Sequence, residues 1–191
     1  MLQEAVQAAE EADIVVLAIG EDRLQSGEAT SNANVRITEV QEALVGWIAD
    51  VSQRILQERP PGTAGARAIV DTLFGKYNPS GKLPMSFPYC VGQVPVHYNE
   101  YSTGRPHIEG KDKDRFRSKY LDIPNEPLYP FGYGLSYTTF EVSDIHLDRT
   151  WMDTSGQIEA EMTVKNTGNC TGTETLQLYI HDIAASVVRQ V

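Results

Sequence analysis

The sequence predicts an α/β domain followed by an incomplete all-β sandwich, with the change near residue 137. In the first region, strong helix formers lead into a short β-rich stretch over 13–19 that is apolar from residue 14 onward. A strand with both faces apolar is typical of a buried parallel strand in an α/β sheet. In the second region, apolar and polar residues alternate over 158–164, which is the period of a strand with one buried face.

The first helix is expected over 2–12 and the first strand over 13–19. The loop 20–37 then leaves the carboxyl end of this strand, which is the edge where open α/β sheets bind ligands. Two glutamates, Glu21 and Glu28, each follow a glycine in this loop. We therefore expect both carboxylates to lie in a loop beyond the end of the strand.

A second helix is expected over 39–56. Thr38 and Gln41 have the spacing of a capping box, in which each side chain satisfies a backbone N–H of the first helical turn. Apolar residues recur along 39–56 at helical spacing, so one face of the helix is predicted to pack on the sheet, with Trp47 in the core.

A shorter helix over about 65–74 is expected to end at Gly75, which suits the left-handed position after a helix C-terminus. From 78 to about 130 the sequence is polar and rich in Gly and Pro, and a loop of this length is typically functional or wraps another surface. Antiparallel strands are expected near residues 140–147, 158–164 and 175–181.

Composition and charge exclude several classes of function. The chain is 41% hydrophobic and 22% charged, as in globular proteins. Its formal net charge of −10 argues against nucleic-acid partners, because phosphate binding depends on clustered Lys and Arg. The longest apolar run, 14–19, is far shorter than the roughly 20 residues of a membrane span, so no membrane partner is expected. Cys90 and Cys170 lie far apart without metal-ligand spacing, and neither a metal nor another cofactor is expected.

Four segments, in this order and spacing, resemble the C-terminal half of glycoside hydrolase family 3 β-glucosidases. They are SGEATSN, LFGKYNPSGKLPMSFP, TGRPH and YPFGYGLSYTTF. The resemblance implies a partial α/β sandwich domain over 1–136 and the start of a fibronectin type III-like sandwich over 137–191. It also implies that one strand of the sheet is missing after residue 55 and that the family's N-terminal barrel domain is absent.

The same resemblance implies a retaining exo-β-glucosidase that hydrolyses terminal β-D-glucosyl residues. Such enzymes use two carboxyl groups, a nucleophile and an acid/base. In this family the nucleophile lies on the barrel and the acid/base on a loop of the α/β domain, which assigns the acid/base role to Glu28. Glu21 remains the rival, since it also follows a glycine and lies closer to the end of the predicted strand. Without the barrel, the chain alone is expected to be inactive.

The expected partners are a β-glucoside or oligosaccharide substrate and the barrel domain. The family implies a periplasmic or extracellular location, although no signal peptide is visible at the start of this sequence. The alternative function is a non-catalytic module that binds a carbohydrate or a protein through its sandwich and the Tyr-rich linker. The candidates for stacking on sugars are Tyr129, Phe131, Tyr133 and Tyr137. Gly132 and Gly134 favour a packed joint for this aromatic segment instead, because they permit close backbone approach.

Overall fold

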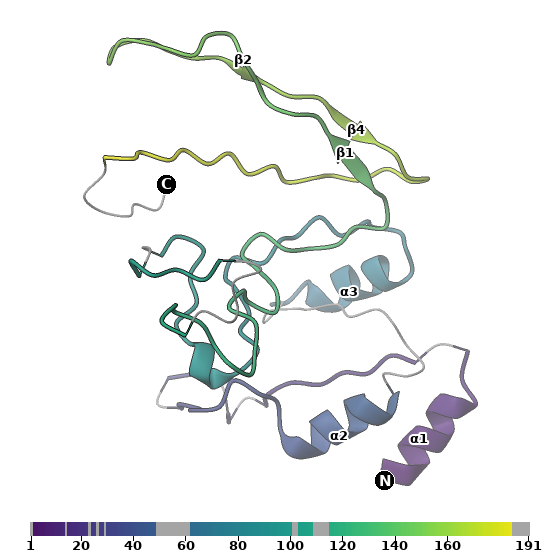
Figure 1. Ribbon diagram of the computed structural model, residues 1–191. Helices are drawn as coiled ribbons and strands as arrows, with labels where there is room; N and C mark the ends of the chain where they lie inside the picture. The colour runs from purple at the N-terminus through teal and green to yellow at the C-terminus, as the bar shows by residue number, and fades with distance from the viewer. Residues whose placement is uncertain are drawn as a thin grey trace. The chain divides into compact units, whose positions relative to one another are not determined.

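The computed structural model describes residues 2–13, 15–22, 24–25, 27–28, 30–48, 62–100, 103–108 and 115–184. They belong to two compact units. The first unit is Met1–Arg59 with Pro88–Pro95, and the second is Pro60–Phe87 with Val96–Val191. Small helices occur in both units, and the short, partial sheets of the described residues lie in the second (Figure 1).

Two helices and one short 3₁₀ turn form the regular structure of the first unit. The helices are α1 (Leu2–Glu10) and α2 (Glu39–Ile48), which pack against each other, and the turn is η1 (Val91–Gln93). Among the described apolar residues, Ala9 of α1 and Ile48 of α2 are buried. The helices predicted at both places are confirmed, although the predicted end of the second one, after Ile48, lies outside the described residues.

Two expectations for this unit are wrong. The residues described within the predicted strand, 13 and 15–19, form no strand ladder. An extended segment becomes a strand only when a neighbour accepts and donates its backbone hydrogen bonds, and the described part of this unit has no such neighbour. Trp47, predicted in the core, is 54% exposed, and the described residues of this unit form no sheet against which it could pack.

The second unit begins with α3 (Gly65–Leu73), as predicted. Its end is well defined: Phe74 N donates to Val70 O at 3.0 Å, and Gly75 N donates to Thr72 O at 3.0 Å. Gly75 has φ +73°, the left-handed conformation expected after a helix C-terminus. No helix among the described residues is long and apolar enough to cross a membrane.

A long antiparallel hairpin follows (Figure 1). β1 (Phe140–Val142) pairs with β4 (Val164–Asn166), and β2 (His146–Leu147) pairs with β3 (Ala160–Glu161). The strands predicted near 140–147 and 158–164 are therefore confirmed. The third, near 175–181, is wrong: this segment is extended but pairs with no described strand.

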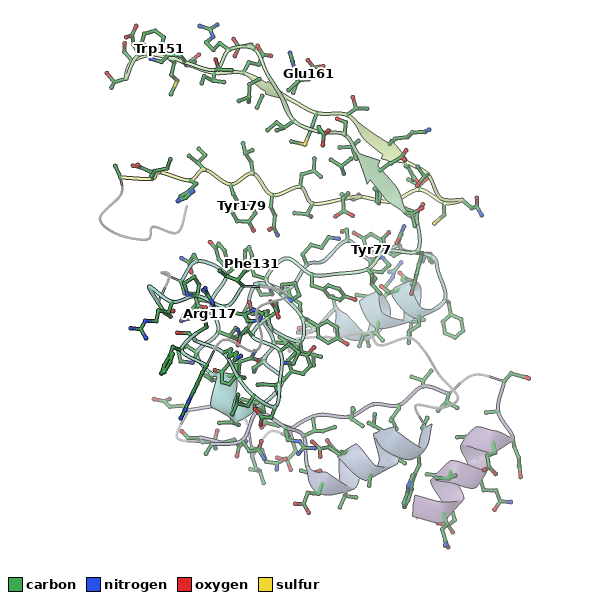
Figure 2. The ribbon with its side chains drawn as sticks, viewed as in Figure 1. Tyr77, Arg117, Phe131, Trp151, Glu161 and Tyr179 are labelled. Atoms are coloured by element: carbon green, nitrogen blue, oxygen red, sulfur yellow. The ribbon has the colours of Figure 1, made fainter. Side chains whose placement is uncertain are left out.

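The extended segment is held by side chains instead of a ladder. Glu174 forms an ion pair with Lys82 at 2.7 Å, and the ring of Tyr179 meets the ring of Tyr98 edge-on. Figure 2 shows Tyr179 directed toward the loops that carry Phe131. Side-chain contacts thus hold this segment. The residues that make them do not recur at regular spacing, so the sequence shows no pattern from which they could be predicted.

Gly134 lies at a close approach of two backbones, as its sequence context predicted, whereas Gly132 lies against the side chain of Gln177. Gly132 has φ +80°, and a Cβ there would overlap the amide of Gln177. A Cβ on Gly134 would overlap the carbonyl oxygen of Gly81. Glycine is favoured at Gly132 by its positive φ and at Gly134 by the nearby backbone carbonyl, which leaves no space for a Cβ.

Candidate functional site

The loop that carries both candidate glutamates starts at Gly20 and is anchored to α2. Gly20 has φ +146°, a conformation that favours glycine. Its backbone N–H donates to Gln41 Oε1 at 3.3 Å, and its carbonyl oxygen accepts from Gln41 Nε2 at 2.9 Å. One amide side chain therefore satisfies both backbone groups of the residue at which the loop turns away.

Glu21 is tied within the loop. Its Oε1 atom accepts a hydrogen bond of 2.6 Å from Asn32 Nδ2, and it lines a polar cavity of about 200 Å³. Asn34 and Arg36 line the same cavity. The Asn32 side chain thus holds the carboxylate of Glu21 in place, and the cavity lies beside this carboxylate.

Glu28 lies in a tight turn farther along the loop. The turn is closed by Thr30, whose backbone N–H and hydroxyl donate to Gly27 O at 3.3 Å and 2.7 Å. Glu28 is exposed, and within the described residues its side chain makes no hydrogen bond or ion pair. Its carboxylate is therefore open to an incoming ligand.

Both glutamates lie outside helices and strands, so their loop location is confirmed, but the strand that this loop was expected to follow is not formed by the described residues. They differ in their surroundings: Glu21 lines the cavity and Glu28 does not. In the described part of the chain, no group of three or more His, Cys, Asp or Glu side chains gathers as it would around a metal ion.

Gln41 is the residue that sequence reasoning misread. The capping-box interpretation assigned its side chain to Thr38, but the amide is used by Gly20, 21 residues earlier in the chain. The helix itself starts as expected, with Glu42 N donating to Thr38 O at 2.9 Å. No local spacing distinguishes these two uses of a glutamine, since the partner Gly20 is brought near only by the fold.

The aromatic residues that were considered for sugar stacking contact other protein groups. Tyr129 packs on Phe87 and Tyr133, with ring centroids 6.4 Å and 4.9 Å apart. Phe131 stacks on Tyr98 at 4.5 Å. The fourth candidate, Tyr137, donates its hydroxyl to Thr72 O at 2.9 Å. These contacts favour a packed joint over a sugar-binding platform.

Comparisons with known proteins place the chain among the glycosidases. Residues 45–137 match the glycosyl hydrolase family 3 C-terminal domain. The chain is 42% identical over 213 residues to the periplasmic beta-glucosidase of Salmonella typhimurium, a match that covers 100% of this chain and 28% of that protein. It is 37% identical to a beta-xylosidase of Formosa agariphila, covering 97% of this chain and 28% of that protein.

A solved structure agrees with these matches. The beta-glucosidase of Listeria innocua in complex with gluconolactone superposes with a TM-score of 0.89 at 38% identity, over 98% of this chain and 29% of that one. The fold thus matches the C-terminal α/β domain of glycoside hydrolases. Through this domain, matched over 45–137, the chain belongs to glycosyl hydrolase family 3. It spans about 28% of the length of these two curated relatives.

Proposed function

We propose that the chain is the C-terminal part of a retaining exo-β-glucosidase that acts on terminal β-D-glucosyl residues. Relatives named as beta-glucosidases and a beta-xylosidase support glycoside hydrolysis for the family. The observation that carries the proposal for this chain is the carboxylate of Glu28, which is exposed, makes no bond to the described residues and is held on a tight turn.

In this proposal Glu28 is the acid/base of a double displacement. It protonates the departing glycosidic oxygen in the first step and takes a proton from water in the second. The nucleophilic carboxylate comes from the barrel domain, which is the proposed partner of this chain. Glu21 has a structural role in the loop in this proposal, because its carboxylate already accepts a hydrogen bond from the Asn32 amide.

We also infer a domain division into 1–136 and 137–191, with one strand missing after residue 55. The match to the Salmonella relative extends over 213 residues although the chain has 191, so the relative has residues that this chain lacks. That relative is named a periplasmic enzyme, which supports a periplasmic or extracellular location for this one.

The test is a graft of residues 20–48 into the Salmonella β-glucosidase, which keeps its own sheet and barrel. Turnover of an aryl β-glucoside by the graft is the expected result. Glu28→Ala in the graft should lower kcat/KM for an alkyl β-glucoside by roughly 10²–10⁴-fold, with a much smaller loss for a dinitrophenyl glucoside that needs no protonation. Added azide should restore turnover with the activated substrate.

Glu21→Gln is the matched control, since it keeps the size of the side chain and removes the charge. It should leave most of the activity and the leaving-group dependence intact. If Glu21→Gln shows the leaving-group pattern and Glu28→Ala does not, Glu21 is the acid/base and the assignment to Glu28 is wrong.

A further inference from the structure

The loop 20–36 is fastened to the first turn of α2 at both ends. At its start, the Gln41 side chain binds both backbone groups of Gly20, at 3.3 Å and 2.9 Å. At its end, Arg36 Nε donates to Glu42 Oε1 at 2.7 Å. Two consecutive residues of one helix therefore hold the two ends of the segment that carries both candidate glutamates.

The Gln41 contact is the stronger of the two. A primary amide that pairs with a backbone N–H and C=O acts like a short piece of neighbouring strand, and its removal leaves both groups without a protein partner. The Arg36–Glu42 pair lies at the surface, with 66% of the arginine side chain open to solvent, and ion pairs of this kind contribute little. The direction in which the loop leaves Gly20 thus depends mainly on Gln41.

We propose that Gln41, assisted by Glu42, is a positioning residue for the acid/base glutamate. This inference rests on the proposed function. A general acid must lie within about 2.6–3.2 Å of the atom that it protonates. Small displacements of a catalytic group lower the rate strongly. Because Gln41 fixes the base of the loop, its loss should impair proton donation by Glu28 more than it impairs sugar binding.

The first test measures hydrogen exchange on the full chain by mass spectrometry. In Gln41→Ala, amide exchange in peptides covering 20–36 should rise roughly tenfold, the effect of losing about one net hydrogen bond. Gln41→Glu should also speed exchange in these peptides, since it places a carboxylate oxygen, which cannot donate a hydrogen bond, opposite the carbonyl oxygen of Gly20. Glu39→Ala is the matched control, on the same helical turn and without a bond in the described structure. Unchanged exchange in Gln41→Ala would overturn the inference.

The second test uses the graft of residues 20–48 in the Salmonella relative. Gln41→Ala should reduce kcat for an alkyl β-glucoside at least about tenfold more than for a dinitrophenyl β-glucoside, with KM nearly unchanged. A role limited to stability would lower both rates equally, because it would reduce only the amount of folded enzyme, and that result would also overturn the inference. A graft that is inactive without any substitution would refute the proposed function, while the exchange experiment still decides whether Gln41 holds the loop.

Discussion

Gly134 lies where two backbones approach so closely that a side chain has no space. We expect Gly134→Ala to destabilise the local structure by about 1–3 kcal/mol, because the new methyl group must push the carbonyl of Gly81 away. The measurement is hydrogen exchange of the amides of Leu83 and Gly132, whose bonds to Tyr133 O and Leu83 O cross this contact. Gly81→Ala is the control, since its Cβ would meet open space. Equal effects from both changes would show that the contact is not tight.

A pH dependence should arise at the ion pair between Lys82 and Glu174. The hydrogen bond from Lys82 holds the pKa of Glu174 below its ordinary value of 4.5, and only 15% and 21% of the two side chains are exposed. A carboxyl group with a lowered pKa in the folded state stabilises that state above its unfolded pKa, and this contribution is lost as the pH falls below 4.5.

We therefore expect the urea midpoint of the wild-type chain, followed by far-UV circular dichroism, to fall more steeply below pH 4.5 than that of Glu174→Gln. The difference should correspond to about 1 kcal/mol or less, because the pair still contacts solvent. Glu159→Gln, at an exposed position of the same unit where the described structure shows no side-chain bond, serves as the control for charge alone. Parallel pH profiles for the wild type and Glu174→Gln would contradict the prediction.

At the scale of elements, two glycines of the helical regions should respond in opposite ways to alanine. Gly46 lies within α2, and a Cβ there would meet nothing within 4 Å. Gly46→Ala should stabilise the helix by about 0.5–1 kcal/mol, since glycine loses more backbone entropy in a helix than alanine. Gly75→Ala should destabilise, because φ +73° is unfavourable for a residue with a Cβ. The measurement is the midpoint of thermal unfolding of each variant, followed by the ellipticity at 222 nm. A shift of the midpoint in the same direction in both variants would refute this account.

Asn78 connects its own loop with two other loop segments of the second unit, at 136–137 and at Thr171. Its Oδ1 atom accepts from Ser136 Oγ at 2.9 Å and Tyr137 N at 2.8 Å, and its Nδ2 atom donates to Thr171 O at 2.9 Å. Asn78→Ala should speed exchange of the Tyr137 amide roughly tenfold or more, because three polar groups lose their partner together. Asn99→Ala is the control, because it removes a side-chain amide that makes no bond in the described structure. It should leave the exchange rate of the Tyr137 backbone amide unchanged. Slow exchange of Tyr137 in Asn78→Ala would mean that other contacts hold this joint.

At the scale of the whole molecule, apolar side chains remain uncovered. Among the described apolar residues, Ala9 and Ile48 are buried, whereas Trp47, Phe74 and Ile180 are 54%, 77% and 89% exposed. Exposed apolar surface of this kind promotes association and dye binding. We expect the isolated chain to bind 8-anilinonaphthalene-1-sulfonate strongly and to self-associate as its concentration rises. Monodisperse protein with a sharp thermal transition and little dye fluorescence would contradict this expectation.

The sequence by itself determined the features that depend on neighbours in the chain. Helix-forming residues and apolar periodicity predict the helices α1, α2 and α3. The place of Gly75 after a helix predicts its left-handed backbone conformation. The loop position of Glu21 and Glu28 follows from the same local pattern. These features are predictable because helical hydrogen bonds join residues four apart, so the residues that decide them lie within one short window.

Only the tertiary structure decided the features that need a distant partner. The β-rich stretch 13–19 and the segment 175–181 have strand-like sequences, yet neither has a described neighbour with which to form a ladder. Trp47 is half exposed for the same reason, since burial of an apolar face requires a second surface. Gln41 matched a local motif but binds Gly20 across 21 positions. Backbone and side-chain groups take the partners that the fold brings near, and the distance along the chain does not reveal which partners those are.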